Sequence, residues 1–288
     1  MSTMSELLAV LELEKLEDNR YLGCNLKQEG QRVFGGQIIA QALIAAQQTV
    51  EMCRHVHSLH GYFLRPGDKE APVIYEVDRI RDGRRFSSRR VIALQHGQAI
   101  FSLESSFQVD ETGLEHQIPM PRDVPPPETL LTQQELIGQF AGRGPVGIKR
   151  YWERERPAEM RPVMLKHYTS REKLEPLQNI WFRAKSPLPA SRATRAAVLA
   201  YLSDVTLLDT ATFAHGRAGF DPDVQLTSLD HAMWFHREDP LDEWLLFSHD
   251  SPSTQSSRGL TRGAIYSRKG TLIASIAQEG LIQVKEES

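Results

Sequence analysis

The chain has 288 residues, of which 40% are hydrophobic and 25% charged, with a formal net charge of −3 at pH 7. This length allows two domains of ordinary size, each with its own core. The slightly acidic balance argues against nucleic acid as a partner. The two cysteines, Cys24 and Cys53, are too few for a disulfide framework or a four-thiolate zinc site. We therefore expect a cytoplasmic protein without a metal or other cofactor.

Targeting and membrane signals are also missing from the sequence. Glu12, Glu14 and Lys15 interrupt the apolar stretch at residues 7–16, so it does not read as a secretory signal. No apolar run approaches the roughly 20 residues that span a bilayer, and the last residues are not a peroxisomal tripeptide. We expect no membrane span.

The first elements expected in the chain are two helices followed by a run of strands. Residues 5–17 predict an amphipathic helix capped by Ser5, and residues 37–46 predict a helix that is apolar on nearly every face and hence buried. Gly35 and Gly36 let that helix begin abruptly; a phosphate-binding loop is disfavoured because no Lys-Ser/Thr pair follows. Strands are expected at 56–64, 73–80, 89–94 and 99–109, which makes the class α+β.

Three histidines lie close together in the first of these strands. His55 and His57 share one face of a strand and His60 lies on the other, with no carboxylate at metal-ligand spacing. Structural or surface roles are favoured over a metal site, although His57 could lie near a vestigial site.

A proline-rich stretch follows, with five prolines between residues 119 and 127. A short polar helix is expected at 128–140 and a glycine-rich turn at 142–144. Stiff, non-helical composition is typical of a spacer. We therefore predict a linker at 119–150 between an N-terminal domain, 1–118, and a C-terminal domain, 151–288.

The second half begins with expected strands at 161–167 and 179–184, then a helix at 191–208 capped by Ser191. Asp204 stands inside that apolar helix, where a carboxylate is costly unless it is paired or hydrogen-bonded. The alternative is a helix-end residue turned to solvent. Further strands are expected at 224–235 and 243–248, a polar loop at 250–257, and a hairpin at 262–276 followed by Gln278.

The second half also repeats part of the first. Shifting the segment that begins at residue 86 by 173 positions aligns Arg89 with Arg262 and Gly97 with Gly270, without a gap. Upstream, His57-Ser58-Leu59 aligns with Thr227-Ser228-Leu229 at a shift of 170. The period is too long for a solenoid. Two diverged copies of one domain are therefore predicted.

Several fragments together resemble the acyl-CoA thioesterase II family, which includes bacterial, mitochondrial and peroxisomal members. The fragments are 33–37 (VFGGQ), 62–68 (YFLRPGD), 81–83 (RDG), 229–236 (LDHAMWFH) and 278–280 (QEG). The resemblance covers nearly the whole chain. It implies a double hotdog fold, in which each half wraps a curved antiparallel sheet around one central helix, and it implies a homo-oligomer, a dimer or tetramer.

The resemblance also implies hydrolysis of acyl-CoA to free fatty acid and CoA by an Asp, Ser/Thr and Gln trio. These roles carry over to Asp204, Ser228 and Gln278, all in the second copy, with the adjacent Thr227 as the alternative to Ser228. In the first copy, Ser105 lies where Gln278 would. A partly buried aspartate can act as a base on water, held by the hydroxyl and amide. No Gly-x-Ser-x-Gly elbow is present, so no covalent acyl-enzyme is expected.

Two alternatives stay open at this point: another hotdog acyl-CoA enzyme, such as an enoyl-CoA hydratase or dehydratase, and a non-catalytic acyl-CoA-binding protein. The first lacks its expected Gly-Asp-x-Asn-Pro-like loop, and the second requires the trio to be without function. Basic side chains should meet the phosphates of coenzyme A. The candidates are Arg65, Arg89, Arg90, Arg258 and Arg262, none favoured over the others.

Overall fold

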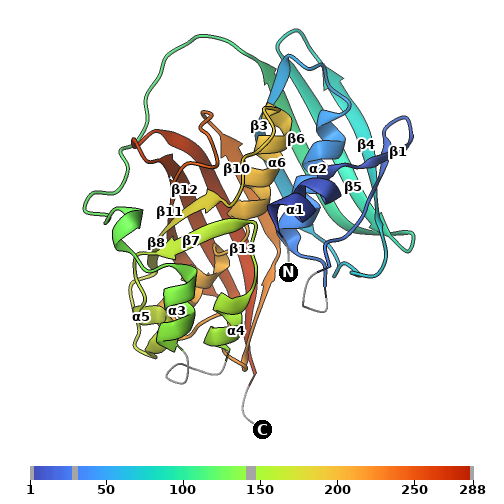
Figure 1. Cartoon of the computed structure of the whole chain (residues 1–288). Helices are drawn as coiled ribbons and strands as arrows, with labels where there is room; N and C mark the ends of the chain where they lie inside the picture. The colour runs from blue at the N-terminus through green and yellow to red at the C-terminus, as the bar shows by residue number, and fades with distance from the viewer. Residues whose placement is uncertain (1–2, 28–31, 141–146, 286–288) are drawn as a thin grey trace.

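One antiparallel sheet curves around two helices in the computed structural model, which describes residues 3–27, 32–140 and 147–285 (Figure 1). Within these residues, 13 strands join in the order β1-β2-β4-β5-β6-β3-β10-β13-β12-β11-β8-β7, with β9 paired to β13. The first half supplies one side of the sheet and the second half the other. This is the α+β, double hotdog arrangement that the resemblance implies.

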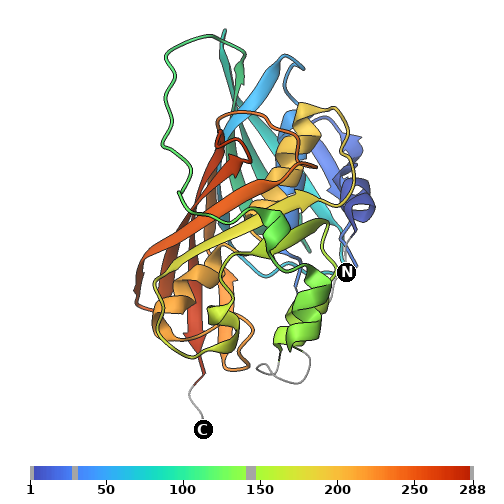
Figure 2. The ribbon, with the colours of Figure 1, turned by 60° about the vertical axis from the view of Figure 1, so that its left-hand side comes forward.

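The first half contains two helices and six strands among the described residues. Their bounds are α1 Met4–Leu11, β1 Glu14–Glu17, β2 Arg20–Gly23, α2 Gly35–Gln47, β3 Arg54–Phe63, β4 Val73–Asp82, β5 Phe86–Gln95 and β6 Gln98–Val109. The connection carries η1 Pro127–Thr129, α3 Gln133–Phe140 and α4 Ile148–Glu153. It runs outside the sheet before it reaches the second half (Figure 2).

The second half repeats the plan of strands around one helix. Its bounds are β7 Ala158–Pro162, α5 Lys166–Thr169, β8 Leu177–Ala184, α6 Arg192–Ser203, η2 Leu208–His215, β9 Val224–Ser228, β10 Asp230–Phe235, β11 Leu245–Gln255, β12 Arg258–Ser267 and β13 Leu272–Val284. The two halves meet where β3 pairs with β10.

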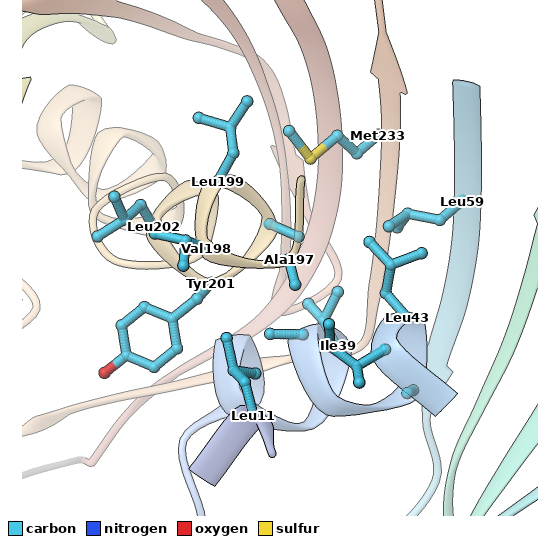
Figure 3. Packing of buried hydrophobic residues seen from close by; sticks show 14 of the residues in the cluster. Leu11, Ile39, Leu43, Leu59, Ala197, Val198, Leu199, Tyr201, Leu202 and Met233 are labelled. Carbon is cyan, nitrogen blue, oxygen red and sulfur yellow. The ribbon is translucent and has the colours of Figure 1, made fainter. Parts of the chain in front are cut away.

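Helices α2 and α6 pack against each other inside the curved sheet (Figure 3). As predicted, α2 is buried along nearly its whole length, because Ala, Ile and Leu occupy every face. The contact layer is completed by Leu59 of β3 and Met233 of β10, which are paired across the join and fully buried. Each such side chain stabilises the fold by roughly 1.5–3 kcal/mol on burial. The join between the halves is therefore part of the core.

Several predicted elements differ from the observed ones. The helix expected at 5–17 ends at Leu11 and is capped by Thr3, and the remainder forms β1. The strand expected at 161–167 is instead the end of β7 followed by α5. The polar segment 250–257 continues β11 to Gln255, because its backbone pairs with β12 on the edge of the core. The predicted turn at 142–144 lies outside the described residues.

The two long hairpins of the repeat differ by one residue in their turns. Gln95 pairs with Gln98 across a two-residue turn, whereas the amide of Ser267 donates to the carbonyl of Thr271 across three residues. The gapless shift of 173 is consequently wrong on one side of the turn.

The strand pairings give the corrected correspondence. Arg89 lies opposite Ser105, and Thr261 lies opposite Gln278. With Ser105 corresponding to Gln278, as the shift of 173 predicts, Arg89 corresponds to Thr261 and not to Arg262. Burial agrees, because Arg89 and Thr261 face the core whereas Arg262 is exposed.

One helical stretch in the described residues, 192–215, is long and apolar enough to cross a membrane. Its most apolar window is 78% buried inside the protein, where α6 forms the core.

Candidate active site

Three polar side chains from separate elements of the second half meet at the end of α6. Asp204 is the C-cap of α6, Ser228 is the last residue of β9, and Gln278 lies in the middle of β13. The Gln278 amide nitrogen donates to Asp204 Oδ1 at 2.9 Å and to Ser228 Oγ at 2.6 Å. Ser228 Oγ donates to the same Asp204 oxygen at 3.4 Å. The three residues chosen from the sequence are thus in mutual contact.

Ser228 lies where β9 ends, with one residue between it and the start of β10. The side chain of Asp230 accepts the backbone N–H of Glu279 at 2.6 Å, and the strand is interrupted at Leu229. Leu229 still exchanges main-chain hydrogen bonds with Glu279 and Phe63. The break ends β9 at Ser228, next to Asp204.

The first half closes the site from the other side. Asp204 accepts a hydrogen bond from the backbone N–H of Gly36, in the first turn of α2. A Cβ added at Gly35 would lie 2.8 Å from Asp204 Oδ2 and 2.9 Å from the ring of Phe63. Only glycine permits this approach of backbone to carboxylate. The trio belongs to the second half, but the site is shared by both halves.

Burial changes the acidity of the aspartate. Removal from water raises the pKa of Asp204 above its ordinary 3.8, to about 6, because the charged form is poorly solvated. Hydrogen bonds from Gln278, the Gly36 N–H and Ser228 oppose this rise by stabilising the carboxylate. The result is a group that is ionised at neutral pH and still basic enough to accept a proton.

A pocket of about 470 Å³ opens beside Asp204 and Ser228, between the two halves. Its wall is mainly apolar and comes from α2, β3, η2 and β9, with side chains such as Phe34, Ile38, Phe63, Leu208 and Leu226. Gln278 is only 1% exposed and does not line this pocket. It lies behind the other two members of the trio, so Asp204 and Ser228 are the groups that a ligand in the pocket can touch.

The pocket also carries a second acid that sequence reasoning missed. Asp209 lies five residues beyond Asp204, in η2, and accepts a hydrogen bond from the Tyr151 hydroxyl at 3.4 Å. Burial raises the pKa of Asp209 to about 6 as well. The only sequence signal for it is an acid within a mostly apolar segment.

The candidate arginines separate clearly by environment. Arg89 is 2% exposed and pairs with Asp82, so it is structural. Three others pair with acids on the surface: Arg90 with Asp78, Arg258 with Glu279 and Arg262 with Asp250.

Arg65 is exposed at the pocket and donates to the Ala99 carbonyl at 2.7 Å. Arg32, which sequence reasoning missed, is also exposed there. Among the described residues, neither takes part in an ion pair with a carboxylate. They are the basic groups at the pocket wall.

The histidines of β3 do not gather around a metal position. His57 contacts Ser106 Oγ at 2.8 Å and His55 lies 3.7 Å from Asp110. No group of three or more possible metal ligands occurs in the part of the chain that the structure describes.

The first half does not reproduce the trio. Ser228 lies opposite Gly280, whose counterpart Phe107 lies opposite Val56. Ser228 therefore corresponds to Val56, and the alignment of Ser58 with Ser228 is wrong by two residues. The first half has no hydroxyl at this position.

Comparisons with known proteins agree along nearly the whole chain. An acyl-CoA thioesterase model matches residues 149–281, and a model described as the acyl-CoA thioesterase N-terminal domain matches residues 26–108. Acyl-coenzyme A thioesterase 8 of Mus musculus is 42% identical over 97% of this chain and 89% of its own. Acyl-CoA thioesterase 2 of Haemophilus influenzae is 37% identical, covering 98% and 99%.

Solved structures give the same result. The acyl-CoA thioesterase II TesB2 from Mycobacterium marinum is 39% identical, with a TM-score of 0.79 over 97% of this chain and 99% of its own. A tesB protein from Mycobacterium avium subspecies paratuberculosis is 32% identical, with a TM-score of 0.81 over 98% and 99%.

Proposed function

Since the chain belongs to the acyl-CoA thioesterase II family and is a thioester hydrolase, we propose that Asp204, Ser228 and Gln278 direct a water molecule onto the thioester carbonyl. The observation that carries the proposal is the convergence of the Ser228 hydroxyl and the Gln278 amide on Asp204 Oδ1, at the wall of the pocket. The products are a fatty acid and CoA.

The reaction needs one base and no acyl-enzyme. Asp204 removes a proton from water as the water oxygen bonds to the carbonyl carbon, which gives a tetrahedral intermediate. The intermediate collapses with cleavage of the C–S bond, and the proton held by Asp204 passes to the departing thiolate. Ser228 orients the water, and Gln278 holds Asp204 and Ser228 in place from behind.

The start of α2 is suited to the negative charge of the intermediate. The first amides of a helix have no partners within the helix, and the helix dipole places partial positive charge there. The Gly36 amide already donates to Asp204, and Gly35 lines the pocket. We propose that the carbonyl oxygen of the substrate lies against this turn, where fixed dipoles stabilise the oxyanion.

The pocket has an apolar part and a basic part, and these suggest how the substrate is oriented. The apolar side chains of the pocket suit the acyl chain, and Arg32 and Arg65 suit the phosphates of coenzyme A. The thioester then lies between them, beside Asp204.

Release of free thiol from acyl-CoA substrates of increasing chain length tests the activity. Asp204→Asn should lower turnover at least about 100-fold, because removal of a general base costs about 10²–10⁴-fold. Undiminished turnover would exclude Asp204 as the base. Hydration of an enoyl-CoA without thiol release would favour the hydratase alternative.

A single turnover in ¹⁸O-water distinguishes direct attack by water from an anhydride on Asp204. Direct attack places ¹⁸O in the fatty acid of the first turnover. An anhydride hydrolysed at the aspartyl carbon gives unlabelled fatty acid first and labels the enzyme instead, which would contradict the proposed mechanism.

We also propose domain boundaries at 1–118, 119–150 and 151–288, a homo-oligomeric state and a cytoplasmic location. The free, exposed thiols of Cys24 and Cys53 suit a reducing compartment. Tyr62 and Trp234 are exposed on the neighbouring strands β3 and β10, which offers an apolar surface for self-association. Light scattering in solution measures the oligomeric state.

A further inference from the structure

A histidine outside the trio contacts the hidden side of Gln278. His231 Nδ1 lies 3.0 Å from Gln278 Oε1, and His231 Nε2 lies 2.9 Å from Ser203 Oγ. His231 is 1% exposed, Gln278 1% and Ser203 0%. Because all three side chains are buried, a hydrogen bond that one of them loses cannot be replaced by a bond to solvent.

The proton positions in this chain of contacts follow from counting donors. The amide nitrogen of Gln278 uses its two protons on Asp204 and Ser228, so the oxygen of the same amide must accept a proton from His231 Nδ1. A neutral imidazole protonated at Nδ1 has a lone pair on Nε2, which lies 2.9 Å from Ser203 Oγ. The single proton of the Ser203 hydroxyl has two acceptors within reach, this lone pair and the Ala200 carbonyl at 2.8 Å. Burial lowers the pKa of His231 to about 4, so the ring is neutral at physiological pH.

We propose that His231 is a positioning residue for thioester hydrolysis: its Nδ1–H holds the Gln278 amide with its nitrogen toward Asp204 and Ser228. This inference rests on the proposed function of the trio. A reversed amide would turn its oxygen toward the Asp204 carboxylate and its NH₂ toward the Nδ1–H, which places like partners against each other at both ends. His231 thus acts on the reaction only through Gln278.

The matched variants are His231→Asn and His231→Leu, whose side chains have the same number and branching of heavy atoms. The Asn amide can place an N–H near the position of Nδ1, whereas Leu cannot donate. We expect His231→Leu to lower kcat about 10- to 100-fold with KM changed less than about 3-fold. His231→Asn should lower kcat less, so that the logarithm of its fold-decrease is at most about two thirds of the value for His231→Leu. Equal losses in both variants would overturn the inference.

The pH profile provides a readout that a merely structural role would not move. The Gln278 amide lowers the pKa of Asp204, so loss of its orientation should move the acidic limb of kcat/KM to higher pH in His231→Leu. His249→Leu is the control: His249 is also buried, at 2%, and lies in β11 away from the pocket. An unmoved limb in His231→Leu would contradict the inference.

Two further measurements protect the test against misfolding and against failure of the proposed function. In the unaltered protein, ¹⁵N NMR of labelled histidine should show one buried ring protonated at Nδ1, assigned by the loss of its signal in His231→Asn; protonation at Nε2 would overturn the inference.

In a Gln278→Ala background, His231→Leu should cause no further loss of kcat. If Asp204→Asn and Gln278→Ala abolish turnover while His231→Leu retains it, only the positioning role fails. If Asp204→Asn retains turnover, the proposed function itself fails.

Discussion

Gly35 and Asp204 approach each other so closely that a methyl group on Gly35 would lie 2.8 Å from the carboxylate oxygen Oδ2. The two residues belong to opposite halves of the chain and to the facing ends of α2 and α6. The contact makes the position of the proposed base depend on the backbone of the other half.

Gly35→Ala should therefore impair catalysis more than folding. The added Cβ forces the Asp204 carboxylate away from its position, and misplacement of a reacting group by about 1 Å can cost about 100-fold in rate. We expect kcat to fall about 10- to 100-fold. Gly138→Ala, in α3 with open space around it, is the control. Wild-type kcat in Gly35→Ala would show that the carboxylate does not need this approach.

The pH dependence of activity should follow the ionisation of Asp204. Its pKa is about 6, and the carboxylate is the proton acceptor, so kcat/KM should be constant above pH 7 and fall tenfold per pH unit well below 6. Asp209 has a raised pKa of about 6 in the same pocket. If Asp204 is the base, the Asp209→Asn variant should still show the fall of kcat/KM below pH 6. Loss of this fall in Asp209→Asn would assign it to the ionisation of Asp209 instead.

Asp204→Asn should change how stability depends on pH. The folded-state pKa of about 6 exceeds the ordinary 3.8, so the folded protein binds this proton more tightly than the unfolded chain. The contribution is fully present below about pH 4 and is lost as the pH rises through 6. The Asp204→Asn variant has no such group to titrate and does not lose this stability as the pH rises. Its free energy of unfolding, expressed as the difference from wild type, should therefore rise between pH 4 and 7 by at most about 3 kcal/mol. Urea unfolding at several pH values measures the difference, and a constant difference would contradict the raised pKa.

Arg65→Ala should weaken binding of coenzyme A without affecting the chemical step. Loss of one charged contact to phosphate should raise KM for acyl-CoA about 10-fold. Hydrogen bonds to charged groups contribute about 1.5–3 kcal/mol in general, and solvent screening keeps an exposed contact near the lower end of this range. An acyl-pantetheine substrate, which lacks the phosphates, should show no change. Arg90→Ala is the control, because Arg90 pairs with Asp78. Equal effects on both substrates would assign Arg65 a structural role.

Much of the fold could be predicted from the sequence where one local signal dominated. The buried helix α2 was clear because apolar residues occupy nearly every face. The part of β11 at residues 250–255 was missed because its residues are polar, and because it is stabilised by pairing with β12, which a local pattern does not reveal.

The site shows the same division. The cost of a carboxylate in an apolar helix made Asp204 a candidate, and the resemblance supplied Ser228 and Gln278. The contributions of Gly35, Gly36 and His231 depend on how two halves of the chain and three elements come together. A one-residue difference in a turn was enough to misalign Arg89, because a shift of one residue along a strand reverses the face.

The pairing of β3 with β10 has a consequence for how the polypeptide can be divided. The two halves adhere through sheet hydrogen bonds and a common core, whereas residues 110–116 are exposed and Gly113 has open space around it. A chain cut at Gly113 should thus remain assembled, and fragments 1–113 and 114–288 produced together should reconstitute turnover. The second fragment alone, despite carrying all three polar residues, should be inert because the α2 backbone is missing from its pocket.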